Sequence, residues 1–205
     1  MKLHFAPKSR ALRIVWLLEE LGLEYDLARY GLGAAEMRSD DFRKLHPMAR
    51  VPVLEDGETV LFESGAIVEY VLEKYGDGRL RPAPSSPDYP AYLQWLHYAE
   101  GMLMPPVNNY MVETVFLPPE RQSEVHAKRA QKLLGYMLAA VDQAVEGKDY
   151  LAGAFSGADI MTGSAAMISQ RVNIDLDAMP HLKAYINRLQ ARDGFQKAMA
   201  IEIGG

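Results

Sequence analysis

The sequence predicts a mixed α/β domain followed by an all-helical domain, joined by a short proline-rich linker. In the first 78 residues, short segments that alternate between apolar and polar side chains are interleaved with segments of helical periodicity. After residue 88, apolar side chains recur at helical spacing alone. Three prolines between positions 82 and 87 keep the intervening chain extended. We therefore expect one domain at 1–78, a linker at 79–88 and a helical domain at 89–205.

The first half begins with a strand, a helix and a second strand. Residues 2–6 alternate in strand fashion and end at a proline. Ser9 suits the N-cap of the helix that follows, and Gly22 suits its C-terminal end. Residues 24–30 alternate again, so the order is βαβ.

The rest of the first half predicts a hairpin and two helices. Residues 40–46 form a short helix that a proline stops. Residues 51–54 and 59–62 read as two strands joined by an Asp-Gly turn. A helix over 64–75, capped by its first serine, completes a ββα unit.

The second half predicts a bundle of about five helices. One apolar stripe runs over residues 92–103 and is interrupted at Pro105-Pro106. A longer stripe runs over 130–145. Further helices are expected at 157–171 and after 179.

Composition excludes several classes of function. The net charge of −5 argues against a nucleic-acid-binding protein. The chain has 0 cysteines, so a disulfide, a cysteine–zinc site or a cysteine nucleophile is ruled out, and any thiol must come from another molecule. Its histidines show no metal-site spacing. The longest apolar run covers six residues, 136–141, far fewer than the ~20 of a membrane-spanning helix. No secretory signal opens the chain, so we expect a cytoplasmic protein without a membrane partner.

Four local strings resemble the cytosolic glutathione S-transferases, in particular bacterial and fungal members with a serine in the active site. The strings lie at residues 9–22, 45–54, 61–67 and 155–160, in the order and at the spacing of that family. The resemblance implies a thioredoxin-like first domain, glutathione as co-substrate without a metal, a homodimer and a role in detoxification. The apolar stripe over 92–103 is a candidate for the dimer interface.

Ser9 is the candidate catalytic residue, because it stands where the first strand leads into the first helix. A free thiol has a pKa of about 8.5 and is mostly protonated at neutral pH. A hydroxyl donor and the positive end of a helix both favour the thiolate. With the family resemblance, Ser9 is expected to activate the thiol of glutathione. From spacing alone, a plain N-cap remains the alternative.

Six residues are candidates for binding glutathione. Glu63-Ser64 is the clearest pair, because a serine at a helix start offers a hydroxyl and free N–H groups to the γ-glutamyl carboxylate, while the glutamate accepts the ammonium group. The resemblance implies that the peptide bond before Pro52 is cis and that the backbone of Val51 pairs with the ligand. An ordinary edge-strand proline and a plain N-cap are the alternatives. The remaining candidates are Arg10, beside Ser9, and Arg50, matched to the glycine carboxylate.

Two further groups of residues complete the candidate list. The resemblance assigns Pro7, Met104 and Tyr110 to a pocket for an apolar electrophile. Ser156 and Asp159 have the spacing of a capping box, so we interpret Asp159 as structural and not as a catalytic acid.

The resulting hypothesis is an enzyme that conjugates the glutathione thiolate to an apolar electrophile. Glutathione-dependent ether cleavage, dehalogenation or isomerisation is one alternative, because the same thiolate would serve. A transferase-like protein that binds ligands or partners without turnover is another. Thiol–disulfide reduction is disfavoured, because residues 7–10 contain no cysteine.

Overall fold

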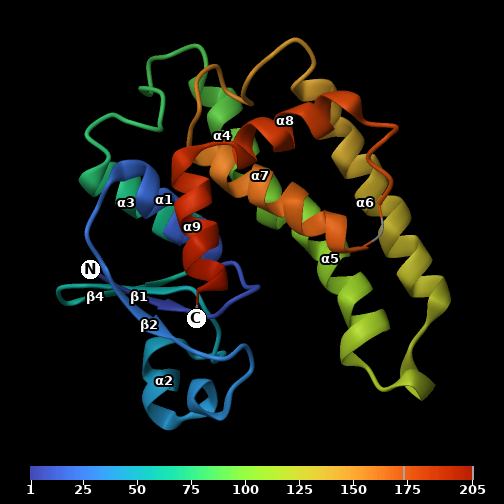
Figure 1. The fold of residues 1–205 in the computed structure, drawn as a ribbon, viewed down its shortest axis with the longest axis horizontal. Helices are drawn as coiled ribbons and strands as arrows, with labels where there is room; N and C mark the ends of the chain where they lie inside the picture. Colours follow the sequence, from blue (N-terminus) through green and yellow to red (C-terminus); the bar gives the residue numbers. More distant parts are fainter. Residues whose placement is uncertain (173, 205) are drawn as a thin grey trace. The chain divides into compact units, whose positions relative to one another are not determined.

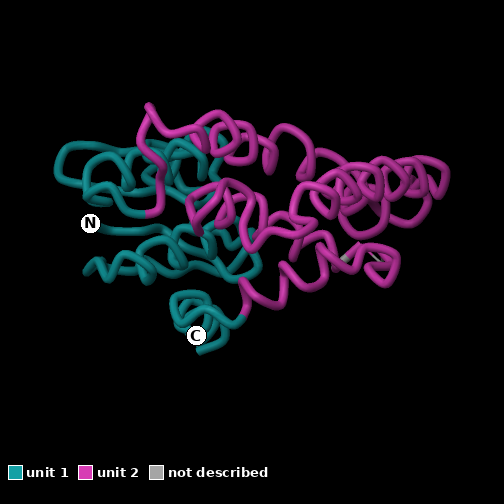
Figure 2. Tube along the Cα trace, turned by 90° about the horizontal axis from the view of Figure 1, so that it is seen from above, with its two compact units in different colours: residues 1–79, 191–205 teal, residues 80–190 magenta. Residues whose placement is uncertain are grey.

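The computed structural model describes residues 1–172 and 174–204. The chain forms two compact units, one made of Met1–Arg79 together with the segment from Ala191 onward, and one made of Leu80–Gln190 (Figure 2). The first break falls at the start of the predicted linker. The C-terminal segment, which the sequence placed with the helical domain, is grouped with the first unit instead.

The first unit is built on a four-stranded sheet with the order β2-β1-β3-β4. Strands β1 and β2 are parallel, whereas β1–β3 and β3–β4 are antiparallel. The predicted βαβ-ββα order and the thioredoxin-like arrangement are confirmed. The strands are β1 (Lys2–Phe5), β2 (Asp26–Arg29), β3 (Val53–Asp56) and β4 (Thr59–Phe62).

Helices cover both faces of this sheet (Figure 1). On β1, Leu3 and Phe5 alternate with His4 and are fully buried on the face that carries α1 and α3. On the opposite face, the His4 ring lies edge-on to Phe42 of α2, with ring centroids 5.8 Å apart. The helices of this unit are α1 (Leu12–Leu21), α2 (Asp40–Leu45), α3 (Ser64–Tyr75) and α9 (Asp193–Ile203), with a 3₁₀ turn, η1, at Ala35–Arg38.

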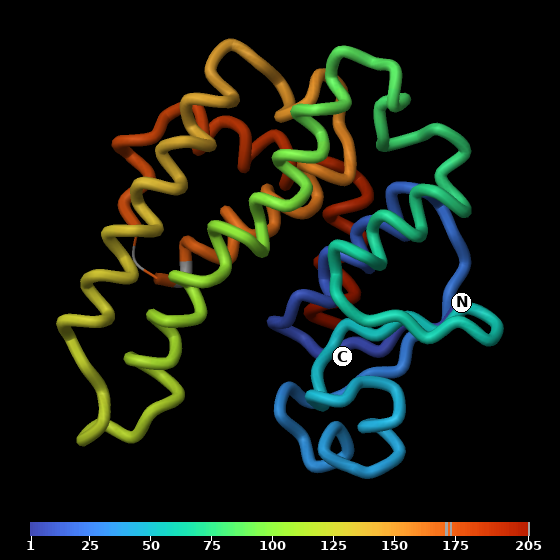
Figure 3. The backbone as a smooth tube through the Cα atoms, turned by 180° about the vertical axis from the view of Figure 1, so that it is seen from behind, coloured from blue at the N-terminus to red at the C-terminus, as the bar shows by residue number. Residues whose placement is uncertain are grey.

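Helix α9 lies beside α1, which explains why the end of the chain belongs to the first unit (Figures 1 and 3). Phe195 packs edge-on against Trp16, with ring centroids 5.0 Å apart. Arg192 donates to both carboxylate oxygens of Glu20, at 2.7 and 2.8 Å. A Cβ at position 194 would lie 2.7 Å from that carboxyl group, so a larger residue there would require the Glu20 side chain to move.

The second unit is helical throughout its regular structure. Its elements are α4 (Tyr89–Tyr98), the π-helical η2 (Ala99–Leu103), α5 (Met104–Met111), the π-helical η3 (Val112–Phe116), the 3₁₀ turn η4 (Pro119–Arg121), α6 (Glu124–Ala144), α7 (Gly157–Ser169), the 3₁₀ turn η5 (Gln170–Val172) and α8 (Pro180–Gln190). Among the residues that the structure describes, no helix is both long and apolar enough to cross a bilayer.

The helix does not end at Pro105-Pro106, where the sequence had predicted an interruption. The chain stays helical, because η2 precedes α5 and the two prolines fall in the first turn of α5. Proline removes a backbone N–H donor from the helix, and the π turn absorbs the change in hydrogen bonding. The expected interruption is therefore a change of helix type.

The apolar stripe of α4 is packed inside the helical unit. Tyr92 and Leu96 are each 1% exposed, and the Thr162 hydroxyl of α7 donates to the carbonyl of Trp95. The expectation that this stripe serves a dimer interface is therefore wrong. The periodicity correctly marked a buried face, but the partner is α7 of the same chain.

Asp159 is fully buried at the start of α7 and acts as a hydrogen-bond acceptor for four groups. One oxygen accepts from the N–H of Leu151 at 3.0 Å and from the Tyr185 hydroxyl at 2.9 Å. The other accepts from the N–H and the hydroxyl of Ser156 at 2.9 and 3.1 Å. Burial raises the pKa of this carboxyl, and the four donors oppose that shift. The capping box at Ser156 and Asp159 is present, as the spacing predicted.

Replacing Asp159 with Ala is expected to lower the free energy of unfolding by at least about 2 kcal/mol, because a cap is lost and buried donors lose their acceptor. Urea unfolding measures the change. The control is Asp149→Ala, which removes an exposed ion pair with Arg188 and should cost less than about 0.5 kcal/mol. An Asp159→Ala protein as stable as the control would contradict the structural role.

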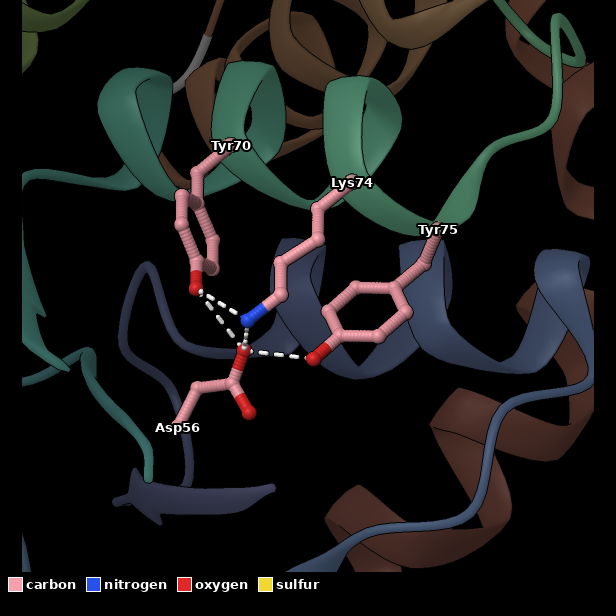
Figure 4. A network of polar contacts seen from close by, with 4 residues as sticks. All are labelled: Asp56, Tyr70, Lys74 and Tyr75. Carbon is pink, nitrogen blue, oxygen red and sulfur yellow. Dashed lines mark hydrogen bonds and ion pairs between the residues drawn. The ribbon is translucent and has the colours of Figure 1, made fainter. Parts of the chain in front are cut away.

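At the hairpin, Asp56 connects β3 to the C-terminal end of α3 (Figure 4). Its Oδ2 accepts from Tyr70 at 2.8 Å, from Lys74 at 2.8 Å and from Tyr75 at 2.6 Å. The Lys74 ammonium lies 5.3 and 5.1 Å from the centroids of the two tyrosine rings. The hydrogen bond from Lys74, followed by the one from Tyr75, lowers the pKa of Asp56 from 3.8 to about 2.

This shift makes the contribution of Asp56 dependent on pH. Because the pKa of Asp56 is lower in the folded state than in the unfolded state, the stabilisation is complete above about pH 4 and is lost as pH falls towards about 2. Wild type should therefore be more stable than Asp56→Asn at neutral pH, by about 1 kcal/mol, and the two should converge in acid. Chemical unfolding at a series of pH values measures this difference. The exposed Asp41→Asn variant serves as control, and a difference that stays constant down to pH ~2 would contradict the assignment.

Candidate functional site

The strand register brings three predicted binding segments to one edge of the sheet. His4 pairs with Val53 and Val53 pairs with Phe62, so β1 and β4 end where β3 begins. The turn after β1, the segment before β3 and the junction after β4 therefore meet at this edge. These segments carry Ser9 and Arg10, Arg50 to Pro52, and Glu63 and Ser64, respectively.

Ser9 lies in the turn between β1 and α1, two residues before the N-cap. The sequence had suggested Ser9 as the N-cap, but the N-cap is Ala11. The helix starts later because 3₁₀-type hydrogen bonds from Leu12 to Ser9 and from Arg13 to Arg10 precede the first α-helical turn. The Ser9 hydroxyl donates to the carbonyl of Ala6 at 2.6 Å and accepts from the N–H of Ala11 at 3.1 Å. It therefore still lies at the N-terminal end of α1.

The backbone immediately before Ser9 has an unusual conformation. Lys8 adopts φ +62°, in the left-handed region that side chains disfavour. Pro7 and Arg10, on either side of this pair, are both half-buried. The orientation of the Ser9 hydroxyl thus depends on a turn whose conformation must be held by its surroundings.

Ser64 is the first residue of α3, and the N-cap is Glu63 at φ +73°. The serine was expected to be the cap itself. Its hydroxyl instead accepts from Nη1 of Arg13 on α1, at 3.2 Å. The first N–H groups of α3 have no helical acceptor, so this end of the helix combines free donors, a positive dipole and a guanidinium. That combination suits a carboxylate.

Arg13 is a candidate site residue that the sequence did not reveal. It is 1% exposed, although arginine is seldom fully buried without a charged or polar partner. The signal was present in the sequence, because Arg13 begins a helix stretch whose next five residues, 14–18, are all apolar. A cationic residue directly beside the apolar run of a helix indicates that its charge is buried.

The His46 ring packs against Phe62 at the end of β4, with ring centroids 4.6 Å apart. It is 7% exposed and its Nδ1 accepts from the N–H of Met48 at 3.1 Å. Burial lowers the pKa of His46, while Glu63 opposes and Arg50 reinforces that shift. Phe62, whose ring packs against His46, directly precedes Glu63, and Arg50 directly follows the turn in which the Ala49 N–H donates to the His46 carbonyl.

The segment before β3 has the geometry that the resemblance implied. The Val51–Pro52 peptide bond is cis. Val51 is half-buried and Pro52 is buried, whereas Arg50 is exposed. An exposed guanidinium beside this backbone is available to a ligand carboxylate.

The residues predicted to contact the electrophile belong to different units, so the geometry within one unit does not test that prediction. Met104 is buried in α5, and Tyr110 is half-buried on the same helix. A pocket in the helical unit lies between α5, η3 and α6, but neither residue lines it. In the described residues, no group of three or more acidic or histidine side chains could hold a metal ion.

Comparison with known proteins decides the family. Residues 1–73 match the family profile "Glutathione S-transferase, N-terminal domain", and residues 103–193 match "Glutathione S-transferase, C-terminal domain". The chain belongs to the glutathione S-transferase family. Glutathione S-transferase 4 of Zea mays is 32% identical to this transferase over 90% of the chain and 85% of its own length. Glutathione S-transferase 3 of the same plant is 30% identical over 98% of the chain and 93% of its own length.

Solved structures agree with this assignment. The glutathione S-transferase of a sphingomonad, in complex with glutathione, is 28% identical and has a TM-score of 0.85, with coverage of 98% of both chains. The fold class and family that the sequence predicted for the transferase are thus confirmed.

Replacing Ser64 with Ala tests the carboxylate site at α3. We expect the dissociation constant for glutathione to rise about tenfold, the equivalent of one charge-assisted hydrogen bond. The free energy of unfolding should also fall by about 1–3 kcal/mol, because Arg13 loses an acceptor. Calorimetric titration and urea unfolding measure the two effects. Ser85→Ala, in the exposed linker, is the control, and a Ser64→Ala protein with wild-type affinity would count against this site.

Proposed function

We propose that this transferase binds glutathione at the sheet edge of the first unit and conjugates its thiolate to an apolar electrophile. The observation that supports the proposal is the pairing of Ser64, at the N-terminal end of α3, with the buried Arg13. In this arrangement the γ-glutamyl carboxylate binds the start of α3, and its ammonium group binds Glu63. The backbone of Val51 and the side chain of Arg50 then hold the remainder of the tripeptide.

Ser9 is the residue proposed to activate the thiol. Its single proton is donated to the carbonyl of Ala6. A hydroxyl rotates freely, so the same proton can turn to a bound sulfur. Together with the N-terminal end of α1 and the donors of Arg10, this hydrogen bond favours the thiolate at neutral pH.

The reaction then needs no covalent intermediate with the protein. The thiol proton leaves to solvent and a sulfur lone pair forms the new carbon–sulfur bond. In a substitution, the leaving group departs with the electrons of the bond that breaks. The protein contributes binding, orientation and stabilisation of the thiolate.

The electrophile, the assembly and the cellular location are further parts of the proposal. Pro7, Met104 and Tyr110 are proposed to contact the electrophile, in a cytoplasmic homodimer. Large apolar side chains that remain exposed on the helical unit supply a candidate interface in place of the buried α4 stripe. They are Met102, Val112, Val115, Phe116, Leu133 and Tyr136.

Ser9→Ala tests the activation step. The variant should bind glutathione nearly as well as wild type, but the pKa of the bound thiol should rise by about 1 unit, the equivalent of ~1.4 kcal/mol. Conjugation of chlorodinitrobenzene at neutral pH should fall about tenfold. Ultraviolet absorbance of the thiolate, followed against pH, measures the pKa, and Ser85→Ala is the control.

Each outcome separates the hypotheses. A fully active Ser9→Ala protein would remove Ser9 from the mechanism. Wild type that binds glutathione tightly without any conjugation would favour ether cleavage, dehalogenation, isomerisation or a role without turnover.

A further inference from the structure

The carboxylate of Glu202, near the end of the chain, contacts the turn that carries Ser9. Its Oε1 accepts a hydrogen bond from the backbone N–H of Lys8, at 2.6 Å, across 194 positions of sequence. Both residues belong to the first unit. Lys8 immediately precedes Ser9, so the contact acts on the backbone that orients the proposed catalytic hydroxyl.

The conformation of Lys8 explains why this turn needs an external contact. Its φ of +62° lies in the left-handed region, where a side chain is sterically disfavoured. Residues held in such conformations persist when the surrounding structure fixes them, and they concentrate at functional sites. The Glu202 carboxylate bonds the N–H of this same residue and therefore helps to fix it.

Helix α9 is anchored at both ends, so it can hold Glu202 in place. At its C-terminal end, Arg29 donates to the carbonyls of Ile201 and Glu202. The same guanidinium lies 5.1 Å from the ring centroid of Phe5, the last residue of β1. At its N-terminal end, Arg192 binds Glu20 of α1. The turn containing Ser9 connects β1 to α1. Helix α9 contacts both sides of this connection, through Arg29, which stacks on Phe5 of β1, and through Glu20 of α1.

The two oxygens of the Glu202 carboxylate lie in different environments. Oε2 is inaccessible to solvent and has no hydrogen-bond partner among the described residues. A buried carboxylate oxygen without a donor is costly and uncommon. The hydrogen bond of this carboxylate is the one from the turn to Oε1.

We propose that Glu202 is a positioning residue of this transferase, which holds the Lys8–Ser9 turn so that the Ser9 hydroxyl faces the bound sulfur. The proposal rests on the proposed role of Ser9. It assigns to the C-terminal helix a part in thiol activation, exerted through a backbone hydrogen bond and without contact to glutathione.

Two variants separate the hydrogen bond from the charge. Glu202→Ala removes both, and we expect about a fivefold loss of kcat, a higher pKa of the bound thiol and little change in the KM for glutathione. Glu202→Gln retains an acceptor for the Lys8 N–H, so kcat and the thiol pKa should stay near wild type. Lys197→Ala, an exposed change on the same helix, is the control and should have no effect.

A direct readout of the turn accompanies the kinetics. Hydrogen exchange of the peptide that contains residues 7–11 should be faster in Glu202→Ala than in wild type, and unchanged in Glu202→Gln. Unchanged exchange in Glu202→Ala would overturn the proposal. So would a Glu202→Gln protein as impaired as Glu202→Ala, because the charge would then be the active feature.

A double-mutant cycle connects Glu202 to Ser9. If Glu202 acts through Ser9, then Glu202→Ala should cost little further activity in a Ser9→Ala background. Fully additive losses would overturn the proposal and leave Ser9 in its role. A fully active Ser9→Ala protein would instead remove the proposed role of Ser9, and this inference would fall with it.

Discussion

The pairing of β1 between a parallel and an antiparallel neighbour is the constraint on which the candidate site depends. This register makes β1 and β4 end where β3 begins, so three loops distant in sequence share one sheet edge. A one-residue slip would turn the buried Leu3 and Phe5 to the opposite face, so burial of these side chains specifies the register. The hydrophobic core and the position of the candidate-site loops are therefore consequences of one pairing.

Much of this architecture could be predicted, because its determinants are local. Alternation marked the strands, the Asp-Gly turn marked the hairpin, and the capping spacing at Ser156 marked α7. The caps of α1 and α3 were each misplaced, by two residues and by one residue, because a serine is equally compatible with several positions at a helix start. Local chemistry thus identified the elements but not their first residues.

What sequence could not reveal was pairing between distant elements. Arg13 meets Ser64 only because α1 and α3 lie on the same face of the sheet. The stripe of α4 was correctly recognised as apolar. The pattern of an amphipathic face does not indicate which element packs against it, and in the structure that element is α7. The residues missed or misassigned are those whose role depends on a long-range contact, whereas those found carry a recognisable motif.

The return of α9 to the first unit has a consequence for biosynthesis. A ribosome releases the N-terminal strands and helices long before it has made Trp16's partner Phe195. The nascent unit must therefore wait, with the α9-binding surface of α1 uncovered, while the entire helical unit emerges. The first unit therefore completes its packing only after the segment from Ala191 onward has been synthesised.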